Sequence, residues 1–182
     1  MTHDAPSWSR RLAGLVLDAS GAVLRAERAA ILALMALLLV LILVNVATRY
    51  SGMPIYWIDE AAVYSVVWLT FIGGSAMTRL RMDFAVTLLT EKVGPAAARG
   101  LKRLAGVGVL GFGLAMLAMC WVWMDPVGIA RAGFDAKAFA AASFNFLYTE
   151  RTQTLNWPTW LLQTVLPLFG ATLSLHAGGN LI

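Results

Sequence analysis

The sequence has few charged residues and a single cysteine. Charged side chains make up 13% of its 182 residues and hydrophobic ones 59%, against roughly 25% and 45–50% in soluble domains. Together with a mean hydropathy of +0.72, this excludes a soluble domain and predicts a membrane protein. Cys120 is the only cysteine and lies in an apolar run. No internal disulfide can form, and a buried structural thiol is expected.

Residues that carry enzyme chemistry are also scarce. The two histidines, His3 and His176, lie near the two ends of the sequence. We therefore expect no bis-histidine haem site and no histidine-based serine or cysteine triad within the membrane. The sequence contains no glycine loop ending in Lys-Ser or Lys-Thr for phosphate, and no cysteine or histidine cluster for zinc. These absences argue against an enzyme and predict neither a cofactor nor a metal.

Four long apolar stretches dominate what is present. They cover residues 29–48, 58–78, 104–124 and 158–176, and each is long enough to cross a hydrocarbon layer of about 30 Å as a helix. We predict an all-α integral membrane protein with one four-helix membrane domain over residues 29–177. No internal repeat is visible, whereas self-sufficient secondary transporters usually contain inverted repeats around a midplane site. The pattern favours an accessory subunit.

The connecting segments are predicted to lie at the membrane surface. In residues 1–28, apolar residues recur at helical spacing opposite basic ones, which predicts a cytoplasmic amphipathic helix; a poorly ordered tail is the open alternative. Asp83–Val93 is too short to cross and predicts a second interfacial helix. Residues 125–157 form the longest polar connection, in which Ala136–Leu147 is a candidate short helix.

Glycine and proline mark the ends and breaks of these spans. Ser51–Pro54 is a turn signal between the first two spans. Pro158 suits the first turn of the fourth span. Pro167 removes the backbone bond to the Gln163 carbonyl and should kink that span, with Thr164 able to help satisfy the freed group.

The basic residues predict the orientation. Ten of the fourteen lie before the first span or between the second and third, and four lie on the other side, namely Arg49, Arg131, Lys137 and Arg151. Basic residues gather on the cytoplasmic side of membrane proteins, so both termini are predicted to be cytoplasmic and residues 125–157 periplasmic. The same rule explains the net charge of +4 without a nucleic-acid partner.

Two stripes of residues predict helix packing. Glu60, Tyr64, Trp68, Phe71 and Ser75 follow one another at helical spacing in the second span. This stripe is more polar and aromatic than lipid requires, so we expect it to face protein; a substrate site is the alternative. Gly73 and Gly74 permit close approach of a neighbouring helix. In the third span, Gly108, Gly111, Ala115 and Ala118 form a stripe of small residues typical of helix contacts, unless they reflect compositional bias alone.

Charged residues at the first hairpin predict an ion pair. Arg49 ends the first span, and Asp59 with Glu60 opens the second on the same side of the membrane. We expect Arg49 to pair with Glu60, which begins the aromatic stripe, and Asp59 to point elsewhere. A partly buried pair would matter for stability, whereas an exposed one would contribute only about 0–1 kcal/mol.

An ordered set of residues resembles a known family. The set consists of Arg49-Tyr50, Trp57-x-Asp59-Glu60, Tyr64, Trp68, Phe71-x-Gly73 and Arg79-x-Arg81, and later Thr154-Leu155-Asn156-Trp157-Pro158-x-Trp160 with Pro167. It resembles the small, DctQ-like membrane subunit of tripartite ATP-independent periplasmic (TRAP) transporters. The similarity covers about residues 28–176. Asp83 and Thr87 stand where the family pattern has a histidine and an acid, so no role is carried over to those two positions.

The resemblance implies a bacterial inner-membrane protein that spans the membrane several times. Its partners would be membrane lipid, a large permease subunit with the substrate and sodium sites, and a periplasmic substrate-binding protein that delivers an organic acid. The small subunit would widen the fixed scaffold of the large one, so its residues would hold position and not bind substrate. A membrane anchor or assembly subunit of an unrelated complex is the alternative.

Overall fold

The computed structural model describes residues 7–81 and 91–182 and is helical over most of them. Four stretches are long and apolar enough to cross a membrane. They are α1 (Ser7–Tyr50), α2 (Trp57–Arg79), α4 (Pro95–Met124), and α7 (Thr159–Gln163) followed by α8 (Val165–Leu181). The described residues form no strand, and one isolated bridge joins Arg151 to Pro158. The prediction of an all-α membrane protein with four spans is confirmed.

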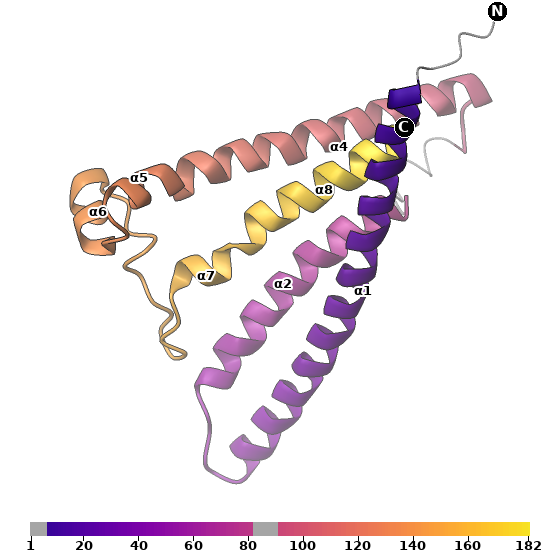
Figure 1. The fold of residues 1–182 in the computed structure, drawn as a ribbon. Coiled ribbons are helices and arrows are strands. Elements are labelled where there is room, and N and C mark those ends of the chain that lie inside the picture. Colours follow the sequence, from indigo (N-terminus) through magenta and orange to yellow (C-terminus); the bar gives the residue numbers. More distant parts are fainter. Residues whose placement is uncertain (1–6, 82–90) are drawn as a thin grey trace, which may run out of the picture.

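The four spans are arranged as a fan. In space, α8 lies between α4 and α2, and α1 packs beside α2 (Figure 1). The helices converge at the end where the C-terminus lies and splay apart towards the end with the α1–α2 turn. There α4 is followed by α5 (Pro126–Arg131) and α6 (Ala136–Ser143) (Figure 1). The fan leaves many large apolar side chains of α1, α2 and α4 exposed.

The N-terminal segment does not form a separate helix. α1 runs without interruption for 44 residues, from Ser7 to Tyr50, so the helix predicted in residues 1–28 and the first span form one helix in the described residues. The reason is local: Arg25–Ala30 contains only good helix formers and no glycine or proline. At about 1.5 Å per residue α1 is roughly 66 Å long, about twice the hydrocarbon thickness, so part of it extends beyond the bilayer.

The turn between α1 and α2 follows from its glycine. Gly52 has a φ of 75°, a conformation that glycine adopts without strain. The amide of Gly52 donates to the carbonyl of Arg49 and the amide of Met53 donates to the carbonyl of Thr48. This pair of bonds is the Schellman motif that closes a helix C-terminus. The turn predicted at Ser51–Pro54 is therefore confirmed.

α4 and α8 approach each other closely at two glycines. A Cβ atom added to Gly113 would lie 3.2 Å from the carbonyl oxygen of Gly170 and would also collide with the Ser174 side chain. A Cβ atom added to Gly170 would lie 3.2 Å from the carbonyl oxygen of Gly113. These two glycines bring the helix backbones together, which is a main source of helix association in lipid.

The predicted small-residue stripe of the third span is not part of this contact. Gly108, Gly111, Ala115 and Ala118 are all exposed, and a Cβ at either glycine would meet nothing within 4 Å. Gly113, which is not part of the predicted stripe, makes the contact with α8 because it lies on another face of α4. Within the described residues, the stripe remains free for a partner outside the chain.

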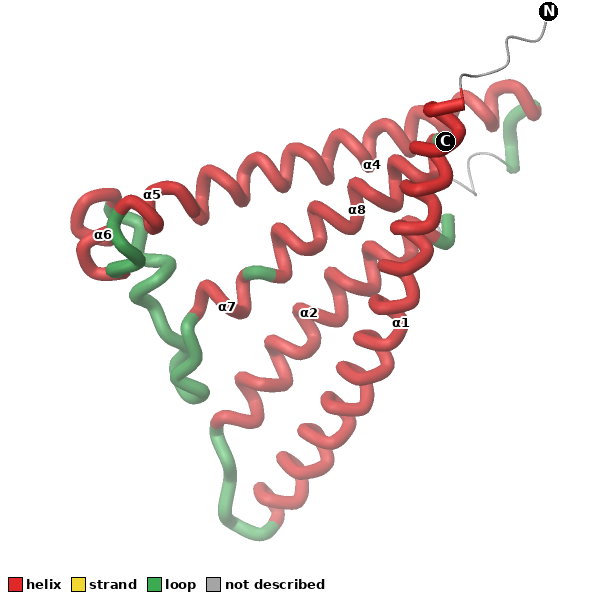
Figure 2. The backbone as a smooth tube through the Cα atoms, viewed as in Figure 1, coloured by secondary structure: helices red, strands yellow, loops and turns green. Residues whose placement is uncertain are grey.

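The fourth span is interrupted where its proline requires it. α7 ends at Gln163 and α8 begins at Val165, so the break at Thr164 (green in Figure 2) lies three residues before Pro167. The predicted kink is confirmed, because Pro167 has no amide for the Gln163 carbonyl. Thr164 acts differently from the prediction: its hydroxyl donates to the carbonyl of Leu161 at 2.6 Å.

The segment between α4 and α7 is folded back onto the end of α4. The Asn145 side-chain amide donates to the Trp123 carbonyl, and the Tyr148 hydroxyl donates to the Met124 carbonyl, each at 2.7 Å. Burial, and then the nearby Asp125 carboxylate, raises the pKa of Tyr148, so the hydroxyl keeps the proton it donates. The candidate helix at Ala136–Leu147 is present but ends at Ser143, because Phe144 adopts a left-handed conformation.

α4 begins earlier than the predicted third span. Gly94 precedes it in an extended conformation and Pro95 occupies its first turn, a common position for proline. Arg99, Lys102 and Arg103 are thus helical. The helix predicted at Asp83–Val93 falls mostly on residues 82–90, which lie outside the described residues, as do Asp83 and Thr87.

The glycine contact gives the first prediction. Gly113→Leu should lower the stability of the purified chain by about 1–3 kcal/mol, because the added carbons must separate α4 from α8. Thermal unfolding in detergent measures the change. Gly111→Leu is the matched control and should unfold like the unaltered chain, because its side chain would enter open space. Equal destabilisation by both substitutions would contradict the assigned contact.

Candidate functional site

The aromatic stripe of α2 packs against the last span of the same chain. The Trp68 indole nitrogen donates to the carbonyl of Leu162 at 3.0 Å. The rings of Phe71 and Phe169 meet edge to face with centroids 5.2 Å apart, a favourable geometry for aromatic pairs. The expectation that the stripe faces protein is therefore confirmed, with α7 and α8 as the neighbouring protein.

The remaining stripe residues continue this contact. The Ser75 hydroxyl, fully buried, donates to the Thr172 hydroxyl at 2.7 Å. A Cβ at Gly74 would lie 3.6 Å from the Phe169 ring, so Gly74 lies against that side chain, whereas Gly73 has open space around it. Tyr64 is half-buried. Trp57, at the start of α2, is exposed, as an interfacial tryptophan would be.

Glu60 anchors the loop that precedes the fourth span. Its carboxylate accepts hydrogen bonds from the backbone amides of Gln153, Thr154 and Leu155 at 2.8–2.9 Å, and from the Thr154 hydroxyl. Consecutive amides that point at one carboxylate form an anion-binding nest. The first turn of α2 is thereby fastened to a loop more than ninety residues further along the chain.

That loop is shaped by its own hydrogen bonds. Thr152 exchanges two bonds with Trp157: its amide donates to the Trp157 carbonyl, and its hydroxyl accepts from the Trp157 amide, both at 2.9 Å. The Arg151 guanidinium donates to the Asn156 carbonyl at 2.8 Å. Pro158 then caps α7 in an extended conformation, which confirms its predicted place at the start of the fourth span. The closed loop presents its amides to Glu60.

Arg49 pairs with Asp59, so the predicted pair with Glu60 is wrong. The Arg49 guanidinium donates to the Asp59 carboxylate at 2.6 Å, and Asn45 bridges the two by donating to Asp59 at 2.6 Å and accepting from Arg49 at 3.0 Å. Asp59 and Glu60 are about 100° apart around the helix. Asp59 faces α1 and Glu60 faces the α7 side. Both side chains of the Arg49 pair are about half exposed, at 57% and 48%, so the pair contributes only about 0–1 kcal/mol.

At the converged end, Arg79 and Arg81 bind the end of α8. Arg79 donates to the Asn180 side-chain oxygen at 3.3 Å, and Arg81 donates to the Asn180 backbone carbonyl at 2.9 Å. The Asn180 amide donates in turn to the Thr78 carbonyl at 2.6 Å. These bonds satisfy carbonyls at two helix C-termini, where cationic side chains are favourable.

The structure also assembles a serine, a histidine and a glutamate, which contradicts the expectation that no such group could form. His176 of α8 lies 2.7 Å from the Ser20 hydroxyl through Nδ1 and 3.0 Å from the Glu27 carboxylate through Nε2. Ser20 and His176 are fully buried and Glu27 is 7% exposed. A catalytic serine must reach a substrate, and this hydroxyl has no exposed surface. We interpret the group as a polar tie between α1 and α8.

Sequence reasoning missed this group because its members are distant in the chain. Ser20 and Glu27 are seven residues apart, hence on one face of α1, and this spacing is the local signal that was available. His176 is 156 residues from Ser20, so no local pattern links them. The sequence predicts no metal site. Within residues 7–81 and 91–182, no three histidine, cysteine or acidic side chains are placed to hold a metal ion.

The Glu60 anchor gives the second prediction. Glu60→Gln should make amide hydrogen exchange at Gln153, Thr154 and Leu155 several-fold faster, because the neutral amide cannot accept all four donors. Asp59→Asn is the matched control and should leave these amides unchanged, since Asp59 bonds only to α1. If both substitutions accelerate exchange equally, the loop is not held by Glu60.

Comparison with known proteins identifies the family. The model of the tripartite ATP-independent periplasmic transporter DctQ component matches residues 38–182, which include all the α2 contacts described above and the break of the fourth span. No curated protein and no solved structure gives a significant match. The match covers most of the chain, and the four membrane-spanning helices agree with it. The chain belongs to the DctQ family and is a small inner-membrane subunit of a TRAP transporter.

Proposed function

We propose that this chain is a scaffold subunit for a large permease subunit that imports an organic acid with sodium, after a periplasmic binding protein delivers the substrate. The observation that carries the proposal is that the polar side chains on α2 and α8 are used to hold the chain together. Ser75, Trp68 and His176 each bond to another helix of this chain. None of these three is left free to bind a solute.

The charge distribution favours a structural role for this chain over direct transport of substrate. The stretches 29–47, 61–77 and 104–124 contain no aspartate, glutamate, lysine, arginine or histidine. Intramembrane ionisable residues usually mark ion and substrate pathways. His176 is the ionisable residue of the fourth span, and both its ring nitrogens are occupied by Ser20 and Glu27.

The exposed helix faces support an association with a larger membrane protein. α4 exposes Leu104, Val107, Phe112 and Met119 together with the free stripe that contains Gly108 and Gly111. Small residues on an exposed helix face permit close approach of another helix. We place the large subunit on this face of α4, since the α2 stripe is already covered by α7 and α8.

The orientation follows from the distribution of basic residues. The converged end of the fan carries Arg79 at the end of α2, Arg81 just beyond it, and Arg99, Lys102 and Arg103 of α4. The splayed end carries Arg49, Arg131, Lys137 and Arg151. We assign the converged end to the cytoplasm and the splayed end to the periplasm. The loop held by Glu60 would then lie on the side from which substrate arrives.

The orientation can be tested with reporter fusions. Fusions after Arg103 and at the C-terminus should report a cytoplasmic location, and a fusion near Lys137 should report a periplasmic one. Paired reporters, one active only in the cytoplasm and one only in the periplasm, control for expression. A cytoplasmic signal at Lys137 would overturn the assignment.

The scaffold role predicts that the chain alone transports nothing. Liposomes that contain only this purified chain should accumulate no labelled organic acid under a sodium gradient, even with loaded binding protein outside. Liposomes that also contain the large subunit should accumulate it. Substrate-dependent uptake by the single chain would refute the proposal, and empty liposomes set the background.

A further inference from the structure

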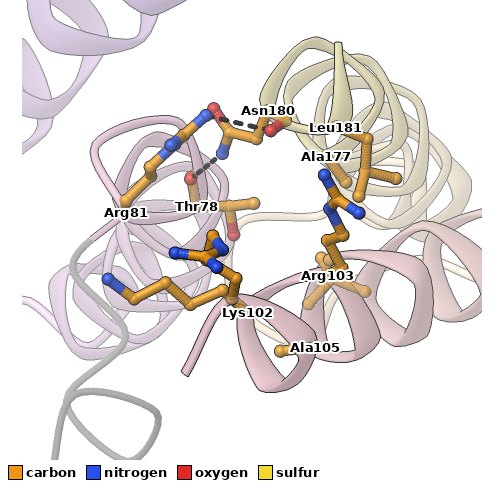
Figure 3. A pocket seen from close by; sticks show the side chains of 11 residues that line it. Thr78, Arg81, Lys102, Arg103, Ala105, Ala177, Asn180 and Leu181 are labelled. Atoms are coloured by element: carbon orange, nitrogen blue, oxygen red, sulfur yellow. Dashed lines mark hydrogen bonds between the residues drawn. The ribbon is translucent and has the colours of Figure 1, made fainter. Parts of the chain in front are cut away.

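A basic pocket opens at the converged end of the fan. It has a volume of about 330 Å³ and lies among the end of α2, the start of α4 and the end of α8 (Figure 3). Four cationic side chains line it: Arg81, just after α2, and Arg99, Lys102 and Arg103 of α4. Among the described residues, no acidic side chain lines the pocket, and none of the four cations takes part in an ion pair.

The cations of this pocket come from two separate segments of the chain. Arg81 follows α2 and comes from one side, while Lys102 and Arg103 come from α4 (Figure 3). Arg81 is held in place by its bond to the Asn180 carbonyl at 2.9 Å. The rule that basic residues gather at one membrane surface explains their number but not their arrangement around one cavity. Several positive charges in one cleft attract an anion, because its binding offsets the repulsion between them.

The pocket lies where the apolar spans end. Arg103 is followed directly by Leu104, where the apolar run of α4 begins, and α2 and α8 end at Arg79 and Leu181. The remaining walls are apolar, with Gly106, Val109, Ala177 and Leu181 among them. The pocket is therefore cationic on one side and apolar on another, which fits an amphipathic anion better than a free one.

We propose that this pocket binds the phosphate headgroup of an anionic phospholipid, with its acyl chains leaving along the apolar wall. Arginine guanidinium groups match phosphate oxygens in paired hydrogen bonds, and basic pockets between membrane helices are known sites for such headgroups. The bound phosphate would join the end of α2 to the start of α4. This site is independent of the transport role proposed above and does not depend on the substrate.

The test uses the full chain purified in detergent and titrated with defined lipids. Native mass spectrometry measures retained lipid, and thermal unfolding measures the stabilisation that binding produces. We expect phosphatidylglycerol and cardiolipin to bind and to raise the unfolding temperature, while zwitterionic phosphatidylcholine does neither. Soluble glycerol phosphate, which offers the same phosphate without acyl chains, should bind at least about tenfold more weakly, because it gains nothing from the apolar wall.

A matched pair of variants assigns the site. Lys102→Gln with Arg103→Gln should weaken binding of phosphatidylglycerol about tenfold or more. Arg10→Gln with Arg11→Gln removes the same charge from exposed positions outside the pocket and should leave binding unchanged. The charge-preserving pair Lys102→Arg with Arg103→Lys should retain binding, which separates lost recognition from lost folding.

Three outcomes would overturn the proposal. Equal loss of binding in the pocket and control variants would mean that the whole basic surface attracts lipid without a site. Undiminished binding by the pocket variant would place the lipid elsewhere. Binding of glycerol phosphate as tightly as lipid would show a site for free anions.

Discussion

The arrangement of this chain depends on how the last helix is held by its three neighbours. In lipid, helices gain little by hiding apolar side chains from one another, so close backbone packing and interhelical hydrogen bonds determine association. α8 supplies both. Gly170 meets α4, Thr172 meets Ser75 of α2, and His176 meets α1. One turn further, Asn180 meets the end of α2. Over residues 170–180, α8 thus contacts all three neighbouring helices.

These contacts agree with the scaffold role proposed above. They lie along the inside of the fan, and the outer faces of α1 and α4 keep their apolar side chains exposed. At the splayed end, Glu60 fastens the loop before α7 to α2 through three backbone amides. At the converged end, Arg79 and Arg81 fasten α8 to α2. α2 is thus joined to the fourth span at both ends, and the exposed surfaces remain for lipid and the proposed larger partner.

The sequence was sufficient to predict the features that have a local cause. The four spans follow from apolar runs, the α1–α2 turn from Gly52, and the break in the fourth span from Pro167. The protein-facing stripe on α2 also followed from periodicity alone. The continuity of α1 was missed because a change from basic to aliphatic residues was interpreted as a boundary, although nothing at Arg25–Ala30 breaks a helix.

Features that depend on which helix becomes a neighbour were not predictable in the same way. Two adjacent acids, Asp59 and Glu60, were possible partners for Arg49. Neighbouring residues of a helix point in directions about 100° apart, so only one of the two can face Arg49. The choice was decided by the loop at residues 153–155, whose amides occupy Glu60 and leave Asp59 to Arg49. Similarly, Gly113 and not Gly111 contacts α8, because Gly113 lies on the face of α4 that packs against Gly170.

The buried group of Ser20, Glu27 and His176 illustrates the same principle at the converged end. α1 is long and otherwise apolar over its span, and an apolar face against lipid or protein does not by itself fix the rotation of a helix. Burying a polar group without a partner is costly, so α1 must turn Ser20 and Glu27 towards the two nitrogens of His176. The tie therefore specifies the rotation of α1 as well as its proximity to α8. A serine, a histidine and a glutamate, which in an exposed cleft would suggest hydrolysis, here determine how one helix faces another.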